Sequence, residues 1–332
     1  MVRREINFQG QRLRGQIRRI PVQGNLPLTR LLREATTILT QAGCDTPRLD
    51  AELLLAEVLG CERGWLLAHP EAQVEEAQTE RFCSLVERRA KREPLPYILG
   101  RAEFYGLTFK VDRRVLIPRP ETELLVEKAL EWISNRDAAS SAPARDFTIA
   151  DVGTGSGAIA VTLAVLLSKG AGTARAISPL IYALDSSSEA LSVAQENARL
   201  HGVEGHIAFL QSHLLGALPE PVDLIVANLP YVPSRKLGSL MPEVAWEPQE
   251  ALDGGPDGLE KIRALLHQAP SRLAEGGAIL LEIGPGQAEK VKSLALESFP
   301  GAQVKAFRDY RGIERVMCIF WDKIPPSYVD HD

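Results

Sequence analysis

The feature that most constrains the fold is a regular alternation of apolar, β-branched runs with helical segments between residues 147 and 320. The expected strands are residues 148–152, 180–184, 206–211, a run that opens at 223, and 278–283. The expected helices are residues 156–168, 188–201, 259–274 and 288–299. Such alternation is typical of an α/β protein with a mostly parallel, doubly wound sheet. Residues 303–307 and 315–320 lack a convincing helix between them, so they predict an antiparallel last strand.

The first 120 residues do not follow this alternation and predict three further segments. Residues 1–27 carry six arginines and one glutamate. We expect a disordered basic extension there, with a transit peptide or a weak contact with RNA as alternatives. Residues 28–93 predict a small helical domain, for which substrate docking and simple packing both stay open. Residues 94–120 mix aromatic and β-branched residues with glycines and predict a β-hairpin linker, which leaves residues 121–325 as the sheet domain.

Composition excludes several classes of function. The 332 residues carry a formal net charge of −5, which disfavours stable nucleic-acid binding. No apolar run approaches the roughly 18 residues of a membrane span. The four cysteines lie far apart and are expected to be reduced core residues, and the six histidines suggest no metal site. We therefore expect a cytoplasmic protein that needs neither a membrane nor a metal.

A glycine-rich loop follows the first expected strand of the sheet and opens a helix. Glycines let the backbone approach a ligand, and the N–H groups of a helix start attract an anion. An acidic residue at the end of the next strand can accept hydrogen bonds from ribose hydroxyls. The spacing fits a dinucleotide loosely, but two details favour S-adenosylmethionine. An acid stands just before the first glycine, and the single residue between the second and third glycines resembles the first motif of Rossmann-like methyltransferases. The candidate cofactor residues are Asp151, Gly153, Thr154, Gly155, Ser156, Gly157 and Asp185.

The expected strand that begins at Asp223 ends abruptly in Asn228-Leu229-Pro230-Tyr231. Ligands of open α/β sheets bind at the carboxyl ends of the strands. A carboxamide, a backbone carbonyl and an aromatic ring are therefore expected at the ligand site. The glycine-rich loop on the first strand together with Asn-x-Pro-Tyr on the fourth resembles methyltransferases that modify a nitrogen conjugated to a π-system, such as adenine N6 or a glutamine side-chain amide. Such a nitrogen is a poor nucleophile, because its lone pair is delocalised. Two acceptors for its N–H groups, Asn228 Oδ1 and the Leu229 carbonyl, would favour its methylation, and Tyr231 can pack on the planar group.

A proline-rich segment, residues 116–123 (Leu-Ile-Pro-Arg-Pro-Glu-Thr-Glu), adds further candidates. The prolines on either side of Arg119 stiffen the backbone and present that side chain from a loop. The alternative is an ordinary helix start with Thr122 near its first turn. Arg119, Glu121 and Thr122 are therefore candidate site residues, and a helix is expected over residues 121–133, followed by a surface loop over residues 135–146.

Together these segments resemble the protein-(glutamine-N5) methyltransferase family that acts on peptide chain release factors. The resemblance covers residues 28 to 322. Its markers are residues 96–100, 103–104, 116–123, 151–158, 228–231, 247–248, 251–259, 281–284 and 308–316. It implies a Rossmann-like class I methyltransferase sheet, S-adenosylmethionine as methyl donor, and the glutamine of the release-factor Gly-Gly-Gln loop as substrate.

The resemblance also implies roles for individual residues. Asn228 and Tyr231 would be catalytic, and residues 228–231 would bind the substrate glutamine. Asn228 would also contact the methyl donor, beside the glycine loop. Two positions depart from the family pattern: Leu229 replaces the first proline of Asn-Pro-Pro-Tyr, and His213-Leu214 stands where an Asp-Trp pair is usual. The first leaves a backbone carbonyl in place, whereas the second changes the pair that lies near the adenine in the family.

Two other functions remain open. Adenine-N6 methyltransferases of nucleic acids share the cofactor loop and the type of motif at residues 228–231, but they would need a basic track and a pocket for a flipped base. The third hypothesis is a catalytically silent scaffold that docks ribosomal partners. The intact Asn228, Tyr231, Asp185 and loop glycines argue against it.

Overall fold

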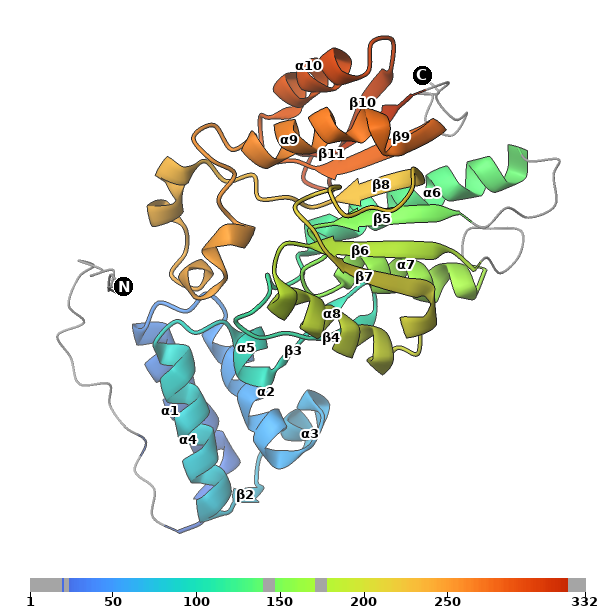
Figure 1. Ribbon diagram of the computed structural model, residues 1–332. Helices are drawn as coiled ribbons and strands as arrows, with labels where there is room; N and C mark the ends of the chain where they lie inside the picture. The colour runs from blue at the N-terminus through green and yellow to red at the C-terminus, as the bar shows by residue number, and fades with distance from the viewer. Residues whose placement is uncertain (1–19, 21–23, 140–146, 171–177, 322–332) are drawn as a thin grey trace, which may run out of the picture. The chain divides into compact units, whose positions relative to one another are not determined.

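A computed structural model describes residues 20, 24–139, 147–170 and 178–321 of the chain. The chain divides into two compact units, residues 1–99 and 100–332 (Figure 1). Of the predicted basic extension, residues 1–19 and 21–23 lie outside the described residues. Within the described ranges, no helix has the length and apolar character needed to cross a membrane, and the four cysteines form no disulfide.

The first unit is helical, as the sequence predicts. Its helices are α1 (Leu28–Gln41), α2 (Pro47–Leu59), α3 (Arg63–Ala68), α4 (Glu76–Ala90) and α5 (Leu95–Leu99). Short strands β1 (Leu26–Pro27) and β2 (Gln73–Val74) pair antiparallel. The apolar faces of α1, α2 and α4 form one core, in which Leu31, Leu54 and Phe82 are fully buried.

The predicted hairpin is correct only in its second half. Residues 95–99 form helix α5 and not a strand, because a proline is tolerated in the first turn of a helix. The hairpin itself consists of β3 (Arg101–Phe104) and β4 (Leu107–Lys110), which pair antiparallel. Its two turn residues, Tyr105 and Gly106, have φ values of +51° and +71°. This conformation matches the right-handed twist of the flanking strands.

The second unit is built on a seven-stranded sheet that confirms the predicted class I methyltransferase fold. Its strands are β5 (Thr148–Val152), β6 (Leu180–Asp185), β7 (Ile207–Gln211), β8 (Val222–Ala227), β9 (Leu273–Glu282), β10 (Gln303–Arg308) and β11 (Glu314–Phe320). They lie in the order β10-β11-β9-β8-β5-β6-β7 (Figure 1). Neighbours from β7 to β9 run parallel, and β11 is antiparallel to both β9 and β10. The central strands are buried on both faces, which explains their continuous apolar runs.

Helices cover both faces of the sheet. They are α6 (Glu123–Ala139), α7 (Ala158–Ser168), α8 (Ser188–Leu200), α9 (Glu260–Gln268) and α10 (Ala288–Ser298). Alternate strand residues point to opposite faces. Thus Ile149 packs in a core with α6 and α7, whereas its neighbour Ala150 packs in a second core with α9 and α10. All parallel strands therefore end at one edge, which carries the candidate site.

Helix α6 runs further than the sequence predicts. Residues 135–139, predicted as loop, form its last turn. Asn135 Nδ2 donates to the Glu131 carbonyl at 2.6 Å, and the Arg136 guanidinium lies 5.3 Å from the Trp132 ring centre. These contacts with the preceding turn continue the helix beyond the apolar pattern. The rest of the predicted loop, residues 140–146, lies outside the described residues.

Candidate active site

Asp151 lies near the end of β5 and is completely buried. Its Oδ2 accepts hydrogen bonds from Thr154 Oγ1 at 2.7 Å and from the Ala160 N–H, in the first turn of α7, at 3.1 Å. Its Oδ1 has no partner among the described residues. Burial raises the pKa of this carboxyl to about 7. An unsatisfied buried acceptor of this kind is suited to a ligand that brings a positive charge.

The loop after β5 depends on its glycines. Gly153, Gly155 and Gly157 have φ values of +75°, +55° and +79°, which strain any residue with a Cβ. A Cβ on Gly153 would lie 3.3 Å from Leu229 Cδ2, so this glycine also lets the strand-end segments of β5 and β8 approach each other. Thr154 and Ser156 between the glycines are buried. The loop is thus a fixed backbone surface.

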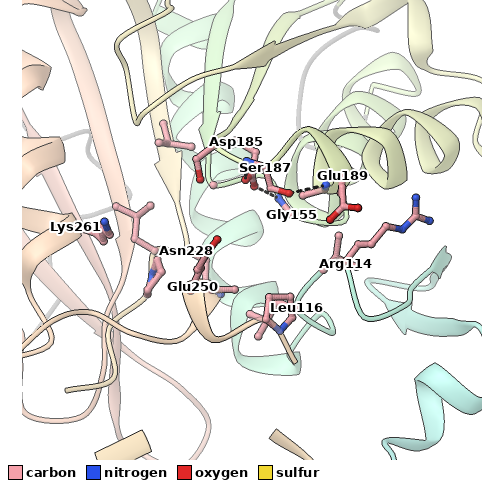
Figure 2. Close-up of a pocket in the computed structure, with 18 of the residues that line it drawn as sticks. Arg114, Leu116, Gly155, Asp185, Ser187, Glu189, Asn228, Glu250 and Lys261 are labelled. Carbon is pink, nitrogen blue, oxygen red and sulfur yellow. Dashed lines mark hydrogen bonds between the residues drawn. The ribbon is translucent and has the colours of Figure 1, made fainter. Parts of the chain in front are cut away.

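Asp185 at the end of β6 is tied to the glycine loop. Its Oδ2 accepts from the Gly155 N–H and its Oδ1 from the Ser187 N–H, both at 2.9 Å (Figure 2). Burial raises the pKa of Asp185, and these backbone N–H groups oppose the rise. A carboxylate oxygen can accept more than one hydrogen bond, so Asp185 can also accept from a ligand hydroxyl at the pocket.

One pocket is lined by residues at the carboxyl ends of several of these strands. Figure 2 shows Asp185 and Asn228 reaching it from different strands, with Arg114 and Leu116 on the segment before α6. Of the predicted residues, it is lined by Gly153, Gly155, Asp185, Asn228, Leu229 and Pro230. Its other lining residues are Arg113, Arg114, Val115, Leu116, Val152, Ser186, Ser187, Glu189, Ala190, Ser212, His213, Leu214, Pro248, Glu250, Ala251 and Lys261. His213 is therefore at the pocket, with an exposed side chain.

The motif after β8 is held from several sides. Asn228 Nδ2 donates to Thr122 Oγ1 at 3.0 Å, and the Tyr231 hydroxyl donates to Glu282 Oε1 at 3.3 Å. The backbone carbonyl of Tyr231 accepts from Gln287 Nε2 at 3.0 Å. The side chain of Leu229 is buried in the core. Asn228 and Tyr231 thus have fixed positions, although Tyr231 does not itself line the pocket.

Glu282, the last residue of β9, is a site residue whose role the sequence did not reveal. It is 1% exposed and accepts from Thr122 Oγ1 at 2.5 Å as well as from Tyr231. Burial raises its pKa to about 7, although these two hydrogen bonds and the nearby Arg315 act in the opposite direction. The sequence signals were a carboxylate at the end of an otherwise apolar strand and its place in residues 281–284, one of the markers of the resemblance.

Arg119 and Glu121 do not line the pocket. The guanidinium of Arg119 pairs with Glu247, whose side chain is 1% exposed, at 2.5 Å. Glu247 also accepts from the Ile117 N–H at 3.1 Å, so one buried carboxylate joins two loops. Residues 113–116 of one loop and residues 248, 250 and 251 of the other line the pocket. Arg119 is therefore a residue that holds the pocket wall, and Glu121 adds negative charge near Glu282.

The segment after this second loop also fixes the motif. A Cβ on Gly254 would come within 2.6 Å of the Pro230 carbonyl, so only glycine fits there. Val232 pairs with Asp253 in a short parallel bridge. Among the described residues, no group of three or more His, Cys, Asp or Glu could hold a metal ion. That the enzyme needs no metal stays a prediction.

Comparisons with known proteins agree with this arrangement. A model of the PrmC N-terminal domain matches residues 30–100, and a methyltransferase domain model matches residues 144–282. The release factor glutamine methyltransferase of Moorella thermoacetica is 42% identical over 87% of this chain and 97% of its own. This chain belongs to the family of release factor glutamine methyltransferases. That of Chlorobaculum tepidum is 40% identical over 86% of this chain and 94% of its own.

Family membership confirms the predicted enzyme class. It also gives a reason for the methyltransferase sheet and for the pocket at the ends of β5, β6 and β8. The roles of the individual side chains do not follow from similarity and rest on the geometry of this methyltransferase.

Proposed function

We propose that this enzyme transfers a methyl group from S-adenosylmethionine to the side-chain amide nitrogen of the glutamine in the Gly-Gly-Gln loop of peptide chain release factors. The observation that carries the proposal is the placement of Asn228. Its carboxamide lies at the pocket, and its nitrogen is held by Thr122. Its Oδ1 is therefore available to accept a hydrogen bond from a substrate N–H.

The donor fits the residues at the ends of β5 and β6. The unpartnered Oδ1 of Asp151 suits the methionyl ammonium. Asp185 suits the ribose hydroxyls, and Gly153 and Gly155 of the glycine loop line the pocket in which the donor would be held. When bound, S-adenosylmethionine supplies a methyl group activated by the positive sulfur. His213, Glu250 and Lys261 are among the other polar residues that line the pocket.

The acceptor nitrogen is activated by orientation. Asn228 Oδ1 and the Leu229 carbonyl accept the two N–H groups of the glutamine amide, which turns its lone pair toward the methyl group. Such fixed dipoles are a major contribution to catalysis, because they need no reorganisation during the reaction. Leu229 acts here through its main chain, while its side chain is buried against Gly153. No strong base is needed, since the alkylated nitrogen loses its proton readily.

Residues 28–93 supply a surface for docking the release factor in this proposal, and residues 121–325 carry out the transfer. In a nucleic-acid methyltransferase, residues 228–231 would bind the exocyclic nitrogen of adenine as they bind the glutamine amide in this proposal. The net charge of −5 does not favour such a substrate, so DNA serves as the competing substrate in the tests.

The Asn228→Ala variant tests the acceptor role. We expect its single-turnover rate of methyl transfer to fall by about 10²–10³-fold, because one preorganised acceptor is lost. The dissociation constant of the donor, measured by calorimetry, should change little. Undiminished turnover by this variant would remove Asn228 from the mechanism.

A further inference from the structure

A chain of hydrogen bonds runs inward from Asn228 to a buried carboxylate. Asn228 Nδ2 donates to Thr122 Oγ1 at 3.0 Å, and Thr122 Oγ1 donates to Glu282 Oε2 at 2.5 Å. Glu282 Oε1 accepts from the Tyr231 hydroxyl. Thr122 is 4% exposed and Glu282 is 1% exposed, so water does not compete for these bonds.

The direction of this chain follows from its inner end. An ionised carboxylate can only accept, and a threonine hydroxyl has a single proton. The proton of Thr122 is committed to Glu282, so Thr122 can only accept from its other neighbour. The NH₂ group of Asn228 must therefore face Thr122. The Oδ1 atom of the same carboxamide then points away from Thr122.

We infer that Thr122 and Glu282 are positioning residues that fix which way round the Asn228 carboxamide faces, and that the charge on Glu282 sets this direction. The inference rests on the proposed function, in which Asn228 Oδ1 accepts from the substrate amide. Neither residue lines the pocket. They act through Asn228.

Protonation of Glu282 reverses the chain. A proton on Oε2 is donated to Thr122, the Thr122 hydroxyl then donates outward, and Asn228 turns its Oδ1 inward to accept it. The substrate N–H groups then meet the Asn228 NH₂ group, and an acceptor becomes a repelling donor. The Tyr231 hydroxyl keeps donating in both states, because burial and the nearby Glu282 raise its pKa.

The groups around Glu282 place this change near neutral pH. Burial raises its pKa to about 7, Glu121 adds to the rise, and Thr122, Tyr231 and Arg315 oppose it. Activity depends on the ionised form. It is therefore complete above this raised pKa and is lost as the pH falls through it. Asp151 has a similarly raised pKa, but it lies under the donor loop and should affect donor affinity.

The test compares kcat against pH at saturating donor for the wild type and three variants. The wild type should lose activity below about pH 7. Glu282→Gln carries an NH₂ group that can donate to Thr122. Its kcat should therefore be about 100-fold lower than that of the wild type and should not fall further below about pH 7. Thr122→Ser should keep the wild-type kcat and its decrease below about pH 7, whereas Thr122→Val should have a much lower kcat. The donor dissociation constant at pH 8 should be the same for all four proteins.

A Glu282→Gln enzyme with the wild-type kcat and the same decrease below about pH 7 would overturn the inference. So would equal rates for Thr122→Ser and Thr122→Val, a pair that decides the matter even where Glu282→Gln does not fold. Failure of the proposed function is distinguishable, because the wild type would then leave the release factor unmethylated at every pH.

Discussion

Asp151 and Glu282 are both buried carboxyl groups with pKa values raised to about 7, yet their oxygens differ in their partners. Asp151 keeps one oxygen without a partner beside the glycine loop. Glu282 has both oxygens occupied by neighbouring hydroxyls. The first is therefore prepared for an incoming charge, and the second orients residues that are already in place.

Donor binding should release a proton from Asp151. The folded protein without donor holds this proton below about pH 7, whereas the ammonium of the donor requires the carboxylate. Between pH 5 and pH 7 the donor dissociation constant should therefore decrease about tenfold per pH unit. Titration calorimetry in buffers of different ionisation enthalpy measures both the affinity and the released proton. Asp151→Asn is the control, which should abolish this slope. A wild-type affinity that does not vary over this range would contradict the assignment.

The site residues that belong to a sequence motif were the easiest to predict. Gly153, Gly155, Asp185 and Asn228 meet at one pocket because parallel strands end at the same edge of a sheet. The role of Glu282 could not be predicted in this way. Its partner Thr122 lies 160 positions away in the sequence, and nothing in the local pattern of either residue indicates the other.

Two loops form one wall of the pocket because Glu247 joins them. It accepts from the Ile117 N–H and pairs with Arg119. The sequence singled out Arg119 for its flanking prolines, but the structure gives it this holding role. Loop positions of this kind depend on long-range contacts, so local sequence gives little information about them.

Glu247→Ala should weaken donor binding by about tenfold, since hydrogen bonds to a charged group are worth about 1.5–3 kcal/mol and part of this holds the wall in place. Glu247→Gln keeps an acceptor for Ile117 and should fall between the alanine variant and the wild type. Calorimetric dissociation constants measure the effect. The matched control is Glu204→Ala, which removes an exposed ion pair with Arg199 far from these loops. Wild-type affinity in Glu247→Ala would show that the two loops do not need this link.

The order of strands and helices in the second unit was predictable, because each parallel strand is a continuous apolar run between amphipathic helices. One error concerns an element end of this unit, and another concerns the segment that precedes it. Residues 95–99 form a helix in spite of two nearby prolines, and α6 continues to Ala139. In both places, contacts within the helix outweigh the local turn composition.

At the scale of the whole molecule, this enzyme methylates a glutamine side chain of a release factor. The most direct test incubates the enzyme with labelled S-adenosylmethionine and either a release factor or DNA, and locates the methyl group by mass spectrometry. We predict one methyl group on the amide nitrogen of the Gly-Gly-Gln glutamine and none on DNA. Methylation of adenine, or of any other residue of the release factor, would contradict the account.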